Sequence, residues 1–229
     1  MVNVNAIISD VLALSDAVYA QRMVQYMQVF KGGYGEGDRF VGLRVGQCRD
    51  IAKRYIQLDL SKYSALLCHD VHEVRLTGFL MLVEQYQKRI YKRADIIDVY
   101  TKHFSGLNNW DLVDLSCVKL LGHYLLDKPR DCLYTYSENE SLWIQRVAIV
   151  STWAFIKSDQ FDDTIRIAKR YVNHDHHLIH KATGWMLREV GKRSASTLLN
   201  FVGTHYDHMP RIMFHYAMEK MPEKKRFFC

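Results

Sequence analysis

The sequence predicts an all-α protein built from repeated helix pairs, and three observations carry this prediction. Apolar residues recur three and four positions apart along almost the whole chain, whereas the alternating pattern typical of β-strands is weak. Proline, which breaks helix interiors, occurs only at Pro129, Pro210 and Pro222. Similar helical segments return at a spacing near 35 residues. We expect a single domain over residues 1–229.

The first part of the chain predicts helices followed by a loop. Residues 5–31 show an amphipathic pattern that indicates one or two helices. Residues 32–46 contain the run GGYGEG, which favours a hinge or a connection between helices. A phosphate-binding loop is the alternative, but the run matches neither GxGxxG nor GxxxxGK[ST], and no strand clearly precedes it.

Repeats follow the glycine-rich loop. Three segments resemble one another: HEVRLTGFLMLVEQY (72–86), SLWIQRVAIVSTWAFI (141–156) and HHLIHKATGWMLREVG (176–191). Aligning Val74, Ile144 and Ile179 gives separations of 70 and 35 residues, so a further unit is expected near residue 109. The helical segment NWDLVDLSCVKLLGHYLL begins there. This period is typical of HEAT or TPR helix pairs, and the TPR signature residues are absent.

This register predicts a layout for the second half of the chain. Helices near 109–126, 141–157 and 176–192 should be parallel neighbours, with helices near 129–137 and 159–172 packed behind them. The equivalent helices would line the concave, basic face of a curved solenoid of HEAT-like repeats. Asp159 and Ser194 are expected to be the N-caps of helices over 160–172 and 195–203.

Composition limits the class of protein. Lysine and arginine total 31 against 25 acidic residues, and the resulting charge of +6 favours a polyanionic partner without proving one. No apolar run is long enough to span a membrane, and the first residues lack the basic leader of a signal peptide. Five dispersed cysteines without a CxxC pair suit a reducing compartment. We therefore expect a cytoplasmic protein that does not enter the membrane.

One carboxylate interrupts an apolar stripe. On the helix that begins near Asn109, Asp114 lies in the middle of the stripe, one turn from Trp110. An ionised carboxylate in such a stripe is costly unless it is paired or functional. The sequence leaves both a structural ion pair and a catalytic role open for Asp114. Asp111 is expected to be a first-turn acid that the helix dipole favours.

Cations flank a tryptophan on a later helix. Lys181, Trp185 and Arg188 follow one another at i, i+4 and i+7, so they share a face. Arg146 occupies the position equivalent to Lys181 one repeat earlier. This pattern suits a phosphate backbone with a flat ring for stacking. The alternative is a solvated face whose tryptophan is covered by the next helix. On the predicted concave surface, these residues would gather beside Trp110 and Asp114.

Histidines cluster before the last repeat, at His174, His176, His177 and His180. His176 and His180 are spaced to share a helix face, which makes a metal site an alternative. No cysteine lies nearby and Asp175 is adjacent rather than one turn away, so solvated histidines are the favoured interpretation. We expect no metal and no other cofactor. No GxSxG nucleophile elbow is present.

Several of these segments together resemble the AlkD-like DNA alkylation repair glycosylases. The resemblance depends mainly on NWDLVD (109–114), WIQRVAIVSTW (143–153) and IHKATGWMLREVGK (179–192). RFVGLRVGQCRDIAK (39–53) and HEVRLTGFLML (72–82) support it, in the order of the family. The loop GGYGEGDRFVG departs from the family's usual Phe-Leu-Gly pattern, so no DNA contact is assigned to it.

The resemblance implies a monomeric glycosylase that removes cationic N3- and N7-alkylated purines from double-stranded DNA. It implies that Asp114 is the catalytic carboxylate, that Trp110 and Trp185 are aromatic residues of the cleft, and that the lesion stays in the duplex. It also implies DNA backbone contacts by Arg146 and Arg188, and Tyr26 matches an N-terminal aromatic residue of the family. Two alternatives stay open: a non-catalytic HEAT-like module for DNA or protein binding, and a metal-dependent hydrolase using the histidines.

Overall fold

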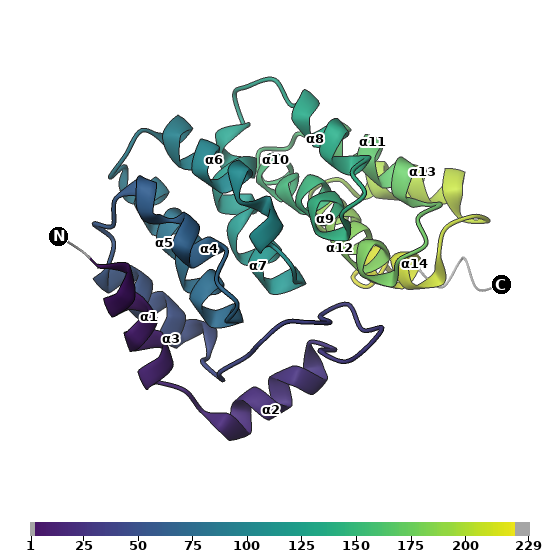
Figure 1. Cartoon of the computed structure of the whole chain (residues 1–229). Coiled ribbons are helices and arrows are strands. Elements are labelled where there is room, and N and C mark those ends of the chain that lie inside the picture. The colour runs from purple at the N-terminus through teal and green to yellow at the C-terminus, as the bar shows by residue number, and fades with distance from the viewer. Residues whose placement is uncertain (1–2, 223–229) are drawn as a thin grey trace. The chain divides into compact units, whose positions relative to one another are not determined.

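The computed structural model describes residues 3–222, and the regular structure in this part of the chain is helical (Figure 1). An isolated bridge between Arg39 and Val71 is the one β-type pairing among the residues described. The predicted all-α class is therefore confirmed. The chain forms two compact units, Met1–Ser116 and Cys117–Cys229. The expectation of a single domain stays a prediction.

The first unit contains seven α-helices within the described residues: α1 (Val4–Ala13), α2 (Ala17–Tyr26), α3 (Val45–Arg54), α4 (Ser64–Leu67), α5 (His72–Lys88), α6 (Arg93–Lys102) and α7 (Trp110–Ser116). Two short 3-10 helices, Leu60–Lys62 and Phe104–Gly106, lie between them. Asn3 and Asp16 cap α1 and α2 through their side chains. The predicted N-terminal helical region is thus confirmed as two helices.

Helix α5 is the centre of the first unit. Its residues from His72 to Val83 are all buried, and it packs against α3, α4, α6 and α7. Apolar side chains on several faces of one helix stay out of water only when neighbouring helices cover all of those faces, which explains this placement. The buried run begins with three polar residues, His72, Glu73 and Arg75, whose partners are part of the candidate site.

The second unit begins with the π-helix η3 (Val118–Gly122). Its α-helices among the described residues are α8 (Asp131–Ser137), α9 (Leu142–Ser151), α10 (Trp153–Ile156), α11 (Asp162–Tyr171), α12 (His177–Arg193), α13 (Ala195–His205) and α14 (Arg211–Ala217). Helix α12 is central here and packs against α9, α11, α13 and α14 (Figure 1).

The predicted helix positions agree well with the structure. The segment 141–157 is α9 followed by α10, and the segment 176–192 is α12. The helices expected near 129–137 and 159–172 are α8 and α11. Helices α9 and α12 are packed neighbours, α8 packs on α9, and α11 packs on both α9 and α12. The repeat register therefore predicted the order and the neighbours of these helices.

One predicted helix cap is confirmed and the other is wrong. The Ser194 side chain accepts a hydrogen bond from the Thr197 amide at the start of α13. Helix α11 instead begins after Phe161, two residues beyond the predicted cap. Asp159 has a left-handed backbone with φ of 57°. Its carboxylate pairs with Arg193 at the end of α12, which turns it away from the start of α11.

The glycine-rich segment connects α2 to α3, as expected. Gly42 has a φ of 94°, and a Cβ at this position would lie 2.1 Å from the Asp16 carbonyl oxygen. The loop therefore passes so close to the start of α2 that only glycine fits. Within residues 3–222, none of the helices combines the length and the apolarity that crossing a bilayer requires.

Candidate active site

A cleft of about 540 Å³ opens in the first unit. Its walls come from α2, α5, α7 and the loop before α3, so four separate stretches of sequence build it. Its aromatic and acidic lining residues are Tyr19, Tyr26, Phe40, Trp110, Glu73, Asp111 and Asp114. A cleft of this size, largely apolar with a few convergent polar groups, is typical of a small-molecule or active site.

Three predicted site residues meet at this cleft. Asp114 and Trp110 lie one turn apart on α7, both are partly exposed, and both line the cleft. Tyr26, at the end of α2, is 64% exposed and contacts the Trp110 ring edge-on, with ring centroids 5.9 Å apart. Asp114 and the two aromatic rings thus line the same concave surface.

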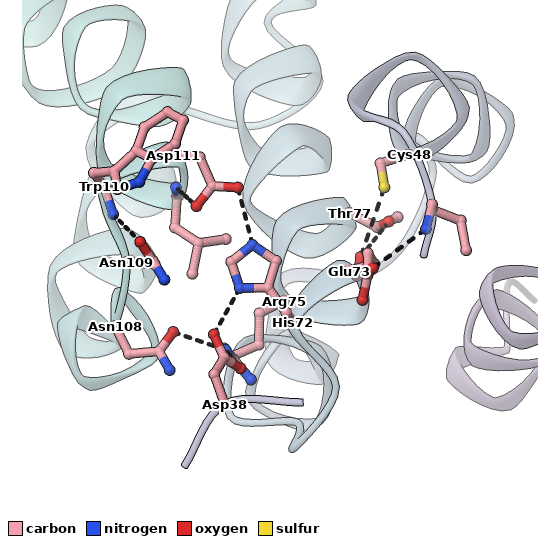
Figure 2. Close-up of polar contacts among 12 residues, drawn as sticks. Asp38, Cys48, His72, Glu73, Arg75, Thr77, Asn108, Asn109, Trp110 and Asp111 are labelled. Carbon is pink, nitrogen blue, oxygen red and sulfur yellow. Dashed lines mark hydrogen bonds and ion pairs between the residues drawn. The ribbon is translucent and has the colours of Figure 1, made fainter. Parts of the chain in front are cut away.

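In the wall of the cleft, His72 is held between two carboxylates (Figure 2). Its Nδ1 lies 2.8 Å from Oδ2 of Asp38, and its Nε2 lies 2.9 Å from Oδ2 of Asp111. The Phe40 ring stacks on the imidazole with centroids 4.2 Å apart. All three side chains of the ion pairs are buried. Together they connect the loop before α3, the start of α5 and the start of α7.

The charges of this group are coupled. Burial disfavours the imidazolium, but the charge of Asp111 and hydrogen bonds to Asp111 and Asp38 outweigh burial and raise the pKa of His72 to about 9. Burial likewise opposes ionisation of Asp38, yet its hydrogen bond to His72 and the charges of His72 and Arg75 hold the pKa of this carboxyl below its usual value. At neutral pH, the imidazolium lies between two carboxylates.

Arg75 completes the buried group. Its NH2 donates to Asp38 at 2.6 Å and to the side-chain oxygen of Asn108 at 2.7 Å. Its Nε donates to the Gly106 carbonyl oxygen at 3.2 Å. The segment just before α7 is therefore fixed by α5, which sets the position from which α7 presents Trp110.

Glu73 fixes the other wall of the cleft. Its carboxylate accepts hydrogen bonds from the backbone amides of Val41, Gly42 and Leu43, at 2.7 to 3.2 Å. Hydrogen bonds to an ionised acceptor are among the stronger ones in proteins. This carboxylate therefore pins the loop that carries Phe40 against α5.

The remaining predicted site residues lie in the second unit. Trp185 on α12 contacts Trp153 with ring centroids 5.1 Å apart, and Lys157 lies 4.2 Å from the centre of the Trp153 ring. Lys181 and Trp185 are partly exposed on α12. The predicted common face of Lys181, Trp185 and Arg188 thus carries a ring pair with cations around it.

The two arginines of this unit differ in their surroundings. Arg188 is partly exposed and pairs with Glu189 at 3.5 Å and with Glu219. Arg146 is only 6% exposed, and its NH1 donates to the Leu178 carbonyl oxygen at 2.8 Å. If Arg146 binds DNA, it does so while its side chain also holds the first turn of α12 through this hydrogen bond.

The histidine cluster builds the start of α12. The His176 ring accepts from the Leu178 amide as an N-cap, and the His174 ring accepts from the His176 amide. Burial, with a smaller contribution from nearby positive charge, lowers the pKa values of His174, His176 and His177. In residues 3–222, no three His, Cys, Asp or Glu side chains are grouped so as to hold a metal ion.

Sequence reasoning missed the group around His72. It assigned Asp111 to the helix dipole, but the side chain instead pairs with His72, 39 residues earlier. No local pattern encodes a pairing of that separation. One signal was available: the run HEVR places three charged or titratable residues at the head of a helix whose next residues, apart from Thr77, are apolar. Buried polar side chains require partners, so this run predicts a network without naming its members.

Comparisons with known proteins agree with this fold. The family model described as DNA alkylation repair enzyme matches residues 7–221. The solved structure of a predicted DNA alkylation repair enzyme from Enterococcus faecalis has a TM-score of 0.73, at 14% sequence identity over 91% of this chain and 97% of that chain. No match was found among curated proteins.

The fold is that of an all-helical protein, and the family model that matches most of the chain assigns its class. The chain belongs to the DNA alkylation repair enzyme family, which confirms the resemblance seen in the sequence. Membership gives it an enzymatic role in the repair of alkylated DNA.

Proposed function

We propose that this protein is a DNA glycosylase that hydrolyses the N-glycosidic bond of cationic N3- and N7-alkylated purines in duplex DNA. One observation carries the proposal: Asp114 lines a cleft beside Trp110 and Tyr26. A protein that only binds the DNA backbone gains nothing from a carboxylate facing phosphates, whereas a glycosylase needs one near the sugar.

The reaction requires a negative charge near the sugar rather than a strong acid that protonates the leaving base. Alkylation at N3 or N7 makes the purine cationic, so the base leaves with the electron pair of the C1′–N bond as a neutral molecule. Positive charge then develops on the deoxyribose, as in other glycosidic cleavages. Asp114 would stabilise this charge and orient the water whose oxygen bonds to C1′, and that water then loses a proton to the solvent. The products are the free base and an abasic site.

The flat rings and cations have supporting roles in this proposal. Trp110 and Trp185 would contact the deoxyribose and favour its cationic form through their ring faces. Lys181, Arg188 and Arg146 would bind phosphates, and Tyr26 would contact DNA at the mouth of the cleft. We further propose that the helix pairs are HEAT-like repeats with these cations on a concave face. The enzyme would act as a monomer inside the cell, where its substrate is.

Replacement of Asp114 by asparagine tests the catalytic assignment. Asp114→Asn keeps the shape of the side chain but removes its charge, so we expect release of 7-methylguanine and 3-methyladenine from methylated duplex DNA to fall by roughly 100-fold or more. DNA affinity should be retained. Base release is measured by chromatography under single-turnover conditions, with and without EDTA.

Asp98→Asn is the matched control, because Asp98 is an exposed carboxylate on α6 that pairs with Lys102. It should leave base release unchanged. Normal release by Asp114→Asn would refute the catalytic role. Absence of release by the unmodified protein on every methylated substrate would favour a non-catalytic DNA-binding module, and loss with EDTA would favour metal-dependent hydrolysis.

A further inference from the structure

We propose that His72 is a positioning residue for the same reaction: it holds Asp111 and offsets its charge, so that Asp114 remains an ionised carboxylate toward the sugar. This inference rests on the proposed role of Asp114. It assigns a function to a side chain in the wall of the cleft of which only about 1% of the surface is exposed.

Hydrogen-bond chemistry fixes the protonation state of His72. Each ring nitrogen faces a carboxylate oxygen within 2.9 Å. A neutral imidazole carries only one N–H, so it would bring a lone pair against one of the two carboxylates. Only the imidazolium donates to both. The pKa of about 9 agrees with this assignment at neutral pH.

The charges around the cleft then balance in pairs. His72 offsets Asp111, and Arg75 offsets Asp38. Glu73 is met by three backbone amides, and the Cys48 thiol stays neutral because burial raises its pKa to about 12. Apart from Asp114 itself, the other titratable groups that line the cleft are three side chains on α2: the exposed Arg22 and the phenols Tyr19 and Tyr26.

Without the imidazolium, Asp111 would act on Asp114. The two residues are spaced i, i+3 on α7, where side chains are about 5–6 Å apart at Cβ. Both line the same cleft. A like charge at this range favours protonation of its neighbour. A protonated Asp114 could not stabilise a positive sugar, so the His72–Asp111 pair protects the ionised state on which the proposed reaction depends.

The pH dependence of base release separates this role from a structural one. In His72→Asn, the limb of the profile where release falls at low pH should move upward by about one pH unit, because Asp111 is no longer offset. Release should recover as the pH rises. Rates are measured in single turnovers from pH 5 to 9, with subtraction of spontaneous depurination.

A double variant supplies the decisive comparison. His72→Asn/Asp111→Asn removes the cation together with the anion it offsets, so its acidic limb should return to that of the unmodified protein. A purely structural His72 predicts the opposite pattern: rates lowered equally at every pH, with no upward shift and no return in the double variant. That pattern would overturn the proposal.

Asp111→Asn alone keeps the proposal testable if His72→Asn does not fold. It leaves the imidazolium beside an uncharged partner, so the acidic limb should move to lower pH, and an unchanged limb would count against the proposal. Folding is checked by circular dichroism and urea unfolding. If Asp114→Asn loses base release but the acidic limbs of His72→Asn and Asp111→Asn do not move, this inference alone fails. If Asp114→Asn releases the base normally, the proposed function fails.

Discussion

Two acidic residues on α7, one turn apart, show how far a residue's type predicts its role. Asp114 interrupts an apolar stripe, and in the structure it lines the cleft together with Trp110, while its catalytic role stays a prediction. Asp111 looks like an ordinary first-turn acid, but it is buried against His72. The sequence predicts which other residues lie on the same face of a residue's own helix. It does not predict a partner from a distant segment, because that partner depends on how the helices pack.

The buried His72 should titrate well above the ordinary value of 6.5 for a histidine. Its pKa of about 9 in the folded protein lies above the ordinary value of 6.5 that applies to the unfolded chain. Folding is therefore favoured by proton binding at His72: this contribution is complete below pH 6.5 and disappears as the pH rises through 9. Relative to His72→Asn/Asp111→Asn, the free energy of unfolding should fall on the order of 1–3 kcal/mol between pH 6.5 and pH 10.

Urea unfolding of both proteins across this range measures the difference, and nuclear magnetic resonance checks its cause. One imidazole should still be protonated at pH 8, and its signal should be missing from the His72→Asn spectrum. A difference in unfolding free energy that does not change with pH would show that His72 is neutral in the folded protein.

The positions of the helices were predicted better than the residues at which they begin, end or break. The 3.6-residue pattern located α9, α10 and α12 because burial of one face repeats along a helix. It missed the break between α9 and α10 at Thr152, where the side chain bonds back to the Ile149 carbonyl oxygen. It also missed the π-helix η3, whose apolar residues continue the pattern without interruption. Such breaks depend on single hydrogen bonds, which hydrophobic spacing does not record.

Packing between α12 and α14 yields a prediction at the scale of elements. A Cβ on Gly184 would lie 2.5 Å from the Met213 carbonyl oxygen and 2.6 Å from the Tyr216 Cβ. Gly184→Ala should therefore push α14 away from α12 and destabilise the protein by about 1–3 kcal/mol. Gly203→Ala on α13 is the matched control, because no atom lies within 4 Å of its added Cβ.

The control should be neutral or more stable by up to about 1 kcal/mol, since alanine favours a helix over glycine. Thermal and urea unfolding of both variants measures the effect. Equal stability changes in the two variants would mean that α14 does not pack closely on α12 at Gly184.

At the scale of the whole molecule, the sequence predicted charge and fold class but not the cleft. The charge of +6 and the helix pattern are properties of the chain that need no coordinates. The cleft joins residues from Tyr19 to Leu115 in four stretches. Its volume of about 540 Å³ depends on how those stretches pack, and residue spacing gives no measure of that. The family resemblance could therefore assign a role to the Asp114 carboxylate, but it did not predict the cleft that Asp114 lines.

The excess positive charge matters for function only where it meets DNA, and Lys181 allows a direct test. Lys181 lies on α12 beside Trp185, and no carboxylate pairs with it in the part of the chain that the structure describes. If it binds a phosphate, Lys181→Ala removes one counterion-releasing contact, and the slope of log affinity against log salt should become shallower by about 1.

Lys102→Ala on α6 is the control, because Lys102 already pairs with Asp98. Fluorescence anisotropy on methylated and unmethylated duplexes at several salt concentrations gives both slopes. A phosphate contact weakens binding to both duplexes equally, so a loss confined to methylated DNA would instead place Lys181 at the lesion, and an unchanged slope would remove it from the DNA surface.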